Sequence, residues 1–501
     1  EGAPLWYRRR FLLPEGFRRE RVLLHIGAAD QIAEVFVNGQ HLCRHEGGYA
    51  SFCVDITEAL AEENELVIRC TDDLHDQAFP YGKQVMNRGG MWYTPVSGIW
   101  QTVWLESVPD IYIEKLNIEN HGASVTISTV PPLDGTVSVE QLGQFPLEHG
   151  QVTIAPENPH FWCPDDPYLY RFTVETAQDK VESYFAIRSL EIKKVGEYPR
   201  LCLNGKPYFF HGLLDQGYWP EGLLTAPAPE SYADDILAMK RLGFNTLRKH
   251  IKVEPEEFYY QCDRLGMIVW QDIVNNGSYS YFRDTVLPTI GIQKRNDRRL
   301  HRDERSRNTF RQGAADAVNQ LKNHPCICYW TIFNEGWGQF DSDRVCGWFR
   351  TLDATRFIDT TSGWFRGKNT NVDSRHQYFG KLRLTGDGLR PLVLSEFGGK
   401  TWRVEGHIFN PDKTYGYGAC PTREALNEAV AALYRESIVP AVEKGLCAAI
   451  YTQVSDVEDE VNGLMTYDRR GVKLDADTML PISRALQDAM EKTVASFEKM
   501  G

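Results

Sequence analysis

The stretch Cys326-Ile-Cys-Tyr-Trp-Thr-Ile-Phe-Asn-Glu335 decides the fold of this chain. A continuous apolar run of this length, rich in aromatic and β-branched residues, is typical of a parallel strand covered on both faces. It ends in an amide and a carboxylic acid, which suits a buried strand whose tip faces a pocket. A second run, Pro391 to Glu396, ends in the same way. Two acids at the carboxyl ends of two buried strands are the ingredients of a glycosidase.

Strands and helices alternate on both sides of this stretch. The pattern predicts strands at 208–212, 245–248, 267–270, 326–335, 356–361, 372–378, 391–396 and 447–452, with helices at 230–242, 255–265, 308–322, 341–353 and 422–444 and one from Ala476 onward. Polar residues at the strand ends favour a (β/α)8 TIM barrel over residues 193–501. An open doubly wound sheet is the rival, but no Gly-rich phosphate loop follows the first strand.

The spacing of the two acids also predicts an irregularity in the barrel. Glu335 and Glu396 are 61 residues apart, so each of the three strand-to-strand steps between them has about 20 residues. That is short for a strand, a helix and two loops. We therefore expect the fifth and sixth helices to be stunted or missing.

Two all-β domains are predicted before the barrel. Short alternating runs with turns between them, including Asn38-Gly39 between two such runs, indicate a jelly-roll β-sandwich over residues 1–108. About 80 further residues of short strands, 109–192, fit an immunoglobulin-like β-sandwich. The aromatic loop from Gly89 to Pro95 has two interpretations: a cover between strands, which is favoured, or a loop that reaches the pocket of a neighbouring domain.

Composition excludes several classes of function. The chain has 501 residues, 42% of them hydrophobic, and a net charge of −13, which argues against nucleic acid as a partner. No apolar run is long enough to cross a membrane. Eleven scattered cysteines without a CxxC pair favour reduced thiols in a cytoplasmic protein. The chain starts at Glu1 without Met, so export stays open. Homo-oligomerisation is a separate possibility that the sequence leaves open.

If the strands run in barrel order, both acids lie at the carboxyl-terminal mouth. There they could sit at about 5–5.5 Å, the separation of a retaining glycosidase. We expect Glu335 to be protonated and Glu396 ionised at working pH. Other candidate substrate-binding residues lie at or beyond neighbouring strand ends. Arg248 and Tyr378 could hydrogen-bond Glu396, Asn334 could bond a sugar 2-hydroxyl, His376 and Asp215 are further polar candidates, and Trp364, Trp402 and Tyr451 are candidate sugar platforms.

On these residues the chain resembles glycoside hydrolase family 2, the family of β-galactosidases, β-glucuronidases and β-mannosidases. The resemblance rests on the runs Gly98-Ile-Trp-Gln-Thr-Val-Trp-Leu-Glu106, Phe333-Asn-Glu-Gly-Trp337 and Ser395-Glu-Phe-Gly-Gly399. It implies a jelly roll, an immunoglobulin-like domain and a barrel, with Glu335 as acid/base and Glu396 as nucleophile. It also implies that the jelly roll lacks its first strands, so that the chain is truncated at its amino terminus.

Two departures from the family bear on the sugar. The Asn-x-Lys motif that holds the substrate carboxylate in β-glucuronidases is replaced by Glu460-Val-Asn-Gly463, without a cation. A uronate beside Glu460 and the run from Asp456 to Asp459 would be repelled, so a neutral sugar is favoured. The family's strand-eight Trp is replaced by Tyr451, which leaves the sugar platform open.

We therefore predict a retaining exo-β-glycosidase that acts on an oligosaccharide or glycoside with a terminal neutral β-sugar, β-galactoside first. The alternatives are a β-mannosidase or β-glucuronidase of the same family, or a catalytically silent carbohydrate-binding protein. No cofactor is expected. Some family members hold Mg²⁺, and the run Asp456 to Glu460 could bind a cation, but a solvated acidic loop is the favoured interpretation.

Overall fold

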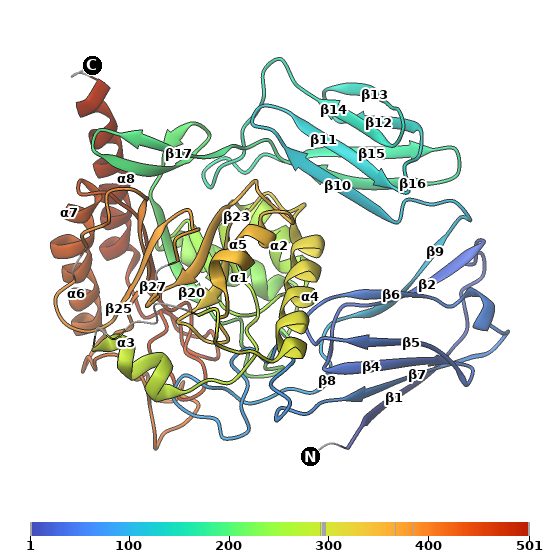
Figure 1. Ribbon diagram of the computed structural model, residues 1–501, viewed down its shortest axis with the longest axis horizontal. Coiled ribbons are helices and arrows are strands. Elements are labelled where there is room, and N and C mark those ends of the chain that lie inside the picture. The colour runs from blue at the N-terminus through green and yellow to red at the C-terminus, as the bar shows by residue number, and fades with distance from the viewer. Residues whose placement is uncertain (1–2, 291, 293–296, 366, 383, 499–501) are drawn as a thin grey trace.

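The computed structural model describes residues 3–290, 292, 297–365, 367–382 and 384–498. Three separate hydrophobic cores divide these residues into a jelly-roll domain, an immunoglobulin-like domain and a barrel, as predicted. In Figure 1 the two β-domains, blue and cyan, lie one above the other on the same side of the barrel. The predicted fold class is confirmed.

The first domain packs two antiparallel sheets. One has the order β1-β7-β4-β5 and the other β6-β2-β9, and a two-residue pair β3-β8 adds to them. Asn38 and Gly39, both with positive φ, form the tight turn of the β4–β5 hairpin. The bounds are β1 Leu5–Phe11, β2 Arg21–Ile26, β3 Ala29–Asp30, β4 Ile32–Val37, β5 Gln40–Glu46, β6 Phe52–Asp55, the 3₁₀ turn Thr57–Ala59, β7 Asn64–Thr71, β8 Gly98–Ile99 and β9 Val103–Val108.

The second domain packs the sheet β10-β11-β14 on the sheet β13-β12-β15-β16. A hairpin, β17-β18-β19, then leads into the barrel. The bounds are β10 Lys115–Asn120, β11 Val125–Val130, β12 Gly135–Val139, β13 Gly143–Leu147, β14 Gln151–Ile154, β15 Tyr170–Thr176, β16 Lys180–Phe185, β17 Leu190–Val195, β18 Tyr198–Leu203 and β19 Lys206–Pro207.

The barrel sheet is parallel throughout and has the order β24-β23-β22-β21-β20-β27-β26-β25. Between β24 and β25 it is closed by the bond from the Asn371 N–H to the Ile358 carbonyl rather than by a ladder. The strands are β20 Phe210–Asp215, β21 Thr246–Lys249, β22 Ile268–Asp272, β23 Ile327–Asn334, β24 Phe357–Ser362, β25 Asp373–Gln377, β26 Leu392–Gly398 and β27 Leu446–Thr452.

Helices cover the barrel unevenly. Among the residues described, the connections 363–372 and 378–391 contain no helix, which confirms the predicted loss of the fifth and sixth helices. The helices are α1 Glu230–Arg241, α2 Glu256–Leu265, α3 Leu287–Thr289 after the π-turn Phe282–Val286, α4 Glu304–Leu321, α5 Ser342–Phe349, α6 Arg423–Leu433, α7 Val439–Val442 after the π-turn Tyr434–Ile438, and α8 Ala476–Glu498.

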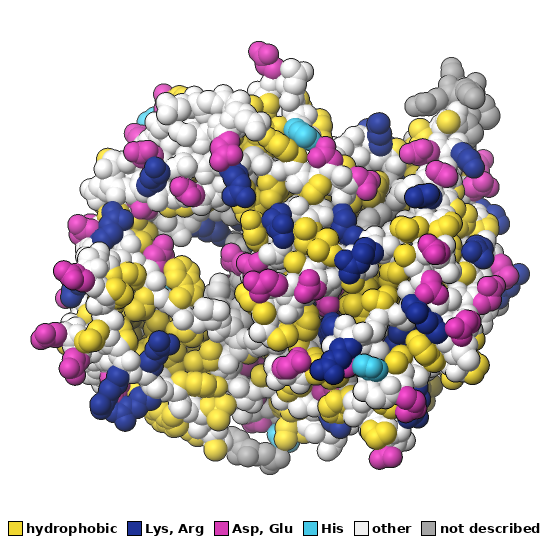
Figure 2. Space-filling model, turned by 180° about the vertical axis from the view of Figure 1, so that it is seen from behind, with side chains coloured by type: hydrophobic (Ala, Val, Ile, Leu, Met, Phe, Trp, Pro, Cys, Tyr) yellow, Lys and Arg dark blue, Asp and Glu magenta, His cyan; other side chains and the backbone are white. Residues whose placement is uncertain are grey.

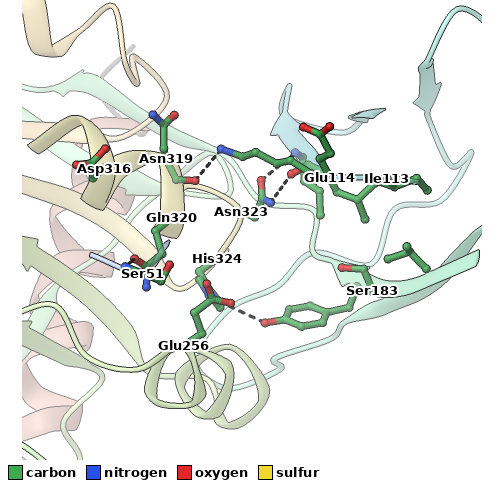
Figure 3. Close-up of a pocket in the computed structure, with 15 residues that line it drawn as sticks. Ser51, Ile113, Glu114, Ser183, Glu256, Asp316, Asn319, Gln320, Asn323 and His324 are labelled. Carbon is green, nitrogen blue, oxygen red and sulfur yellow. Dashed lines mark hydrogen bonds between the residues drawn. The ribbon is translucent and has the colours of Figure 1, made fainter. Parts of the chain in front are cut away.

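A cleft of about 560 Å³ marks the place where the three domains meet. Figure 3 shows Asn319, Asn323 and His324 of the barrel on one side, facing Glu114 and Ser183 of the second domain. Figure 2 shows the surface hollowed between the two β-domains and the barrel. The cleft lies away from the strand ends that carry the two acids.

Candidate active site

The barrel brings the two strand-end acids together. Glu335 follows the last residue of β23, and Glu396 lies near the end of β26. One oxygen of each carboxylate and one ring nitrogen of His376, on β25, all lie within 4.8 Å of one another. Three strands that are distant in sequence therefore place these side chains at one point of the barrel mouth.

Local backbone geometry turns Glu335 toward this point. Its φ of 52° is in the left-handed region, which costs a residue with a side chain on the order of 1 kcal/mol or more. Two contacts hold the conformation: the Glu335 N–H donates to the Ser362 carbonyl at 2.9 Å, and Oε1 contacts Nδ1 of His376 at 2.8 Å. The Glu335 side chain is 15% exposed and so remains reachable by a ligand.

Glu396 is buried and surrounded by donors. Arg248 Nη1 donates to Oε1 at 3.0 Å, the hydroxyl of Tyr378 donates to Oε2, and His376 Nδ1 lies 3.5 Å from Oε2. Burial alone would raise the pKa of Glu396. The neighbouring His376, Arg248 and His250, together with the Tyr378 bond, outweigh burial and lower the pKa of Glu396 from its usual value. The side chain is therefore set up as a carboxylate.

Arg248 is the centre of the buried network. It is fully buried and pairs with both oxygens of Asp272 at 3.0 Å, in addition to Glu396. Its Nη2 also donates to Oδ1 of Asn334 at 2.9 Å. Since the amide oxygen of Asn334 is used in this way, its NH₂ group is the end that remains for a ligand.

The other predicted residues divide into two groups. Trp364 lies beside the acids, with its ring centroid 5.7 Å from that of His376, and Trp402 is half-buried after β26. Asp215 instead pairs with Lys249 at 2.6 Å, in a buried network of its own. Tyr451 is 1% exposed and packs against Phe397, so it has no open face for a sugar. The platform interpretation of Tyr451 is wrong, because its ring is buried between Phe397 and Tyr434 of the helix layer.

Several residues at the mouth escaped sequence reasoning. His250 contacts Asp272 at 2.7 Å, and Tyr417 stacks on Tyr378 with centroids 4.1 Å apart. Neither lies in a motif that the sequence singles out, since both come from irregular segments. His250 directly follows the last residue of β21, which is the one signal that could have marked it.

The aromatic loop of the first domain crosses to the mouth. Trp92 packs edge-on against Trp337 at 5.2 Å, the hydroxyl of Tyr93 donates to Glu460 Oε2 at 2.5 Å, and the Thr94 N–H donates to Glu458 Oε1 at 2.9 Å. The loop therefore reaches the neighbouring domain, and the favoured interpretation as a cover between strands is wrong. The reason is tertiary: its partners lie more than 240 residues away.

The acidic run 456–460 is buried rather than solvated. Asp456 pairs with Lys473 at 2.6 Å, and Arg88 pairs with Asp459 at 3.1 Å and with Glu458 at 3.6 Å. The prediction of a solvated loop is wrong because cations that are distant in sequence neutralise these carboxylates. Among the residues that the structure describes, the run 456–460 does not bring three ligand atoms within 4.8 Å of one another, as a cation site would need.

The comparisons with known proteins agree with this architecture. The family model described as "Glycosyl hydrolase 2 galactose-binding domain-like" matches residues 1–88, the model "Glycosyl hydrolases family 2" matches 110–188, and the model "Glycosyl hydrolases family 2, TIM barrel domain" matches 194–383. This chain belongs to glycoside hydrolase family 2.

Family 2 relatives carry more than one name. A "Beta-galactosidase" of Thermoanaerobacter pseudethanolicus is 24% identical over 65% of this chain and 44% of its own length. A "Beta-glucuronidase" of Bacteroides fragilis is 23% identical over 65% of this chain and 49% of its own length. The chain spans about half the length of these relatives.

Solved family 2 structures share the fold. An uncultured Clostridium sp. β-glucuronidase superposes with a TM-score of 0.72 at 19% identity, over 98% of this chain and 88% of that one. A β-D-glucuronidase of Dictyoglomus thermophilum gives a TM-score of 0.72 at 17% identity, over 98% and 90%. In the described part of this chain, no helix is both long and apolar enough to cross a bilayer.

Proposed function

We propose that this chain is a retaining exo-β-glycosidase. The observation that carries the proposal is the approach of the Glu335 and Glu396 carboxylates to within 4.8 Å. Retaining glycosidases hold their carboxyl groups about 5–5.5 Å apart, whereas inverting enzymes need about 6.5–9.5 Å to admit a water molecule between acid and sugar. The short separation favours direct attack by a carboxylate on the sugar.

The surroundings divide the two roles. Glu396, kept ionised by its cationic neighbours, attacks the anomeric carbon and forms a covalent glycosyl-enzyme. Glu335, more exposed and bonded to one ring nitrogen, gives a proton to the leaving oxygen as the glycosidic bond breaks. It then takes a proton from the water that cleaves the glycosyl ester, which frees Glu396 and the sugar.

We favour a neutral β-sugar, with β-galactosides first. Arg88 and Lys473 form ion pairs with three of the four carboxylates between Asp456 and Glu460, and Glu460 itself forms none among the described residues. This disfavours a uronate. Because most of the negative charge of this run is neutralised, its repulsion of a uronate carboxylate is weaker than the sequence suggests. A β-glucuronidase, as several relatives are named, is therefore the second candidate.

The test is hydrolysis of nitrophenyl β-galactoside, mannoside, glucoside, arabinoside and glucuronide by the wild-type chain and two variants. Glu396→Gln should lower kcat by about 10⁴-fold or more while the variant still folds and unfolds in a cooperative thermal transition. Glu335→Ala should regain part of its turnover of activated substrates with azide, which replaces water and needs no general base. Ordinary activity of Glu396→Gln would end the proposal. A wild-type chain that hydrolyses none of these glycosides would also end it, because that result is expected of a silent carbohydrate-binding protein.

A further inference from the structure

Lys83 is a cation at the barrel mouth that the acid pair and its network do not use. It belongs to the loop 72–97 of the first domain, and its side chain is half-buried. Its ammonium nitrogen lies 5.5 Å from the ring centroid of Trp92. Among the residues that the structure describes, this nitrogen forms no hydrogen bond or ion pair, so its three N–H donors remain for a ligand.

The loop holds Lys83 in a fixed place. On one side the Tyr81 hydroxyl donates to the Gly277 carbonyl at 2.7 Å and accepts from Trp337 Nε1 at 3.2 Å. On the other side Tyr93 is bonded to Glu460. Between them, the Tyr93 N–H donates to the Lys83 carbonyl at 3.0 Å, so the backbone of Lys83 is held between the loops that follow β22 and β27.

Aromatic rings connect this place to the acid pair. The Trp92 ring lies 5.2 Å from that of Trp337, two residues beyond Glu335, and 4.9 Å from that of Tyr279. Burial, together with the negative charge of Glu335, raises the pKa of Tyr279, which places the tyrosine within electrostatic reach of the acid. Trp337 and Tyr279 therefore connect Trp92 to the side of the mouth that carries Glu335.

The charge of Lys83 acts on two sides of the mouth. Burial raises the pKa of Glu460, and the positive charge of Lys83 opposes that rise. Burial also lowers the pKa of His250, and the charge of Lys83 lowers it further. The ammonium beside Trp92 is therefore near enough to the last barrel loop and to the residue after β21 for its charge to act on both.

We infer that Lys83 binds the substrate, donating a hydrogen bond to a hydroxyl of the neutral sugar held by the acid pair, with Trp92 beside it. The inference rests on the proposed function and adds a specificity-determining residue from another domain. A hydroxyl suits the position because it can accept from the ammonium while it donates to a nearby carboxylate, and Glu460 is the nearby carboxylate on which Lys83 acts.

The test compares wild type, Lys83→Met and Lys83→Arg on the aryl β-glycoside that the wild type hydrolyses fastest. Lys83→Met keeps the length of the side chain and leaves the main-chain bond to Tyr93 in place. It should lower kcat/KM about 10- to 100-fold, the loss expected for one hydrogen bond from a charged donor, and Lys83→Arg should restore part of it. Lys413→Met, which removes an exposed charge from a neighbouring loop, is the matched control and should change kcat/KM less than twofold.

Deoxygenated substrates decide whether the contact is direct. If Lys83 binds a hydroxyl, the ratio of wild-type to Lys83→Met activity should fall to about one for one of the 3-, 4- and 6-deoxy derivatives and persist for the others. An equal ratio for all three would overturn the inference, and so would wild-type activity of Lys83→Met on the parent sugar. A loss confined to a β-glucuronide would also overturn it, since the ammonium would then serve a carboxylate.

A binding measurement separates failure of this inference from failure of the proposed function. In the Glu396→Gln background, the dissociation constant of the same glycoside, followed by tryptophan fluorescence, should rise about 10-fold or more on adding Lys83→Met. This readout needs no turnover, so a chain without hydrolytic activity still tests Lys83. An unchanged dissociation constant overturns the inference even where the wild type is an active glycosidase.

Discussion

The two β-domains meet the barrel at opposite ends of its strands. The immunoglobulin-like domain contacts the amino-terminal end, where the Tyr184 hydroxyl donates to Asp263 at 2.7 Å and Arg188 donates to the Pro325 and Ile327 carbonyls. The jelly roll sends its loop to the carboxyl-terminal end, where Tyr93 bonds Glu460. Barrel enzymes build their sites at the second end, whereas the first end contributes stability. Two similar β-domains therefore have different expected roles.

The two interfaces differ in chemistry as well as place. Asp263 at the first interface has both oxygens occupied, by Tyr184, His324 and the Cys326 N–H, so it closes a satisfied buried network. The loop at the second interface presents half-buried groups, Lys83 and Trp92, beside an opening. A satisfied network holds domains together, and free donors at an opening are what a ligand needs.

The largest expected effect breaks the first interface. Asp263→Asn removes a buried charge that accepts three hydrogen bonds, so it should cost about 2–4 kcal/mol and lower the midpoint of thermal unfolding. The kcat/KM of the folded protein should stay within twofold. Asp166→Asn, an exposed acid bonded to His160 in the same domain, is the control and should leave the midpoint in place. A loss of activity without a loss of stability would contradict the division of roles.

The next effect lies at the acid pair. Tyr378→Phe removes a hydrogen bond that lowers the pKa of Glu396, so kcat/KM should fall about 10- to 100-fold. Glu396 acts as a carboxylate, and its pKa lies below 4.5, so activity is retained above that value and lost as pH falls through the lowered pKa. In the variant the acid limb of the pH profile should move to higher pH. Tyr168→Phe, which removes the hydrogen bond from a half-buried tyrosine of the second domain to Gln141, should leave the limb unmoved.

A smaller effect is expected where the loop joins the barrel. Tyr93→Phe removes the donor to Glu460 but keeps the buried ring. The free energy that holds the loop on the barrel should therefore fall by about 1–2 kcal/mol. We expect KM to rise about 3- to 10-fold with a smaller change in kcat, measured by steady-state kinetics. A lowered unfolding midpoint with an unchanged KM would assign this interface to stability, like the first.

The smallest effect concerns the exposed end of the loop. Arg88 is 34% exposed, but its partner Asp459 is buried and keeps only the hydrogen bond from Asn410 among the residues described, so Arg88→Met should cost about 1 kcal/mol. Turnover of a neutral glycoside should change less than twofold. The difference in stability between Arg88→Met and the wild type should shrink at high salt. A tenfold loss would show that neutralisation of the buried acids matters more than the geometry of the loop.

Much of the fold could be read from local patterns. The buried run that ends in Glu335 and the alternation of strands and helices predicted the barrel, and the short spacing to Glu396 predicted the two absent helices. Hydrophobic periodicity and the length of a segment depend on residues that are close together in the chain, so both can be read directly from the sequence. The hydrogen bond from Arg248 to Glu396 followed from the barrel topology, since both strands end at the same mouth.

The sequence by itself determined the three domains, the strand tips and the two acids at them, because each depends on residues close together in the chain. Tertiary structure alone decided that Tyr451 is buried, that Asp215 pairs with Lys249, that the acidic run is buried, and that Lys83 lies beside Trp92 in the loop that reaches the barrel. These outcomes depend on contacts between side chains that are far apart in the sequence. Such contacts determine burial and charge pairing, and a local sequence pattern does not contain them.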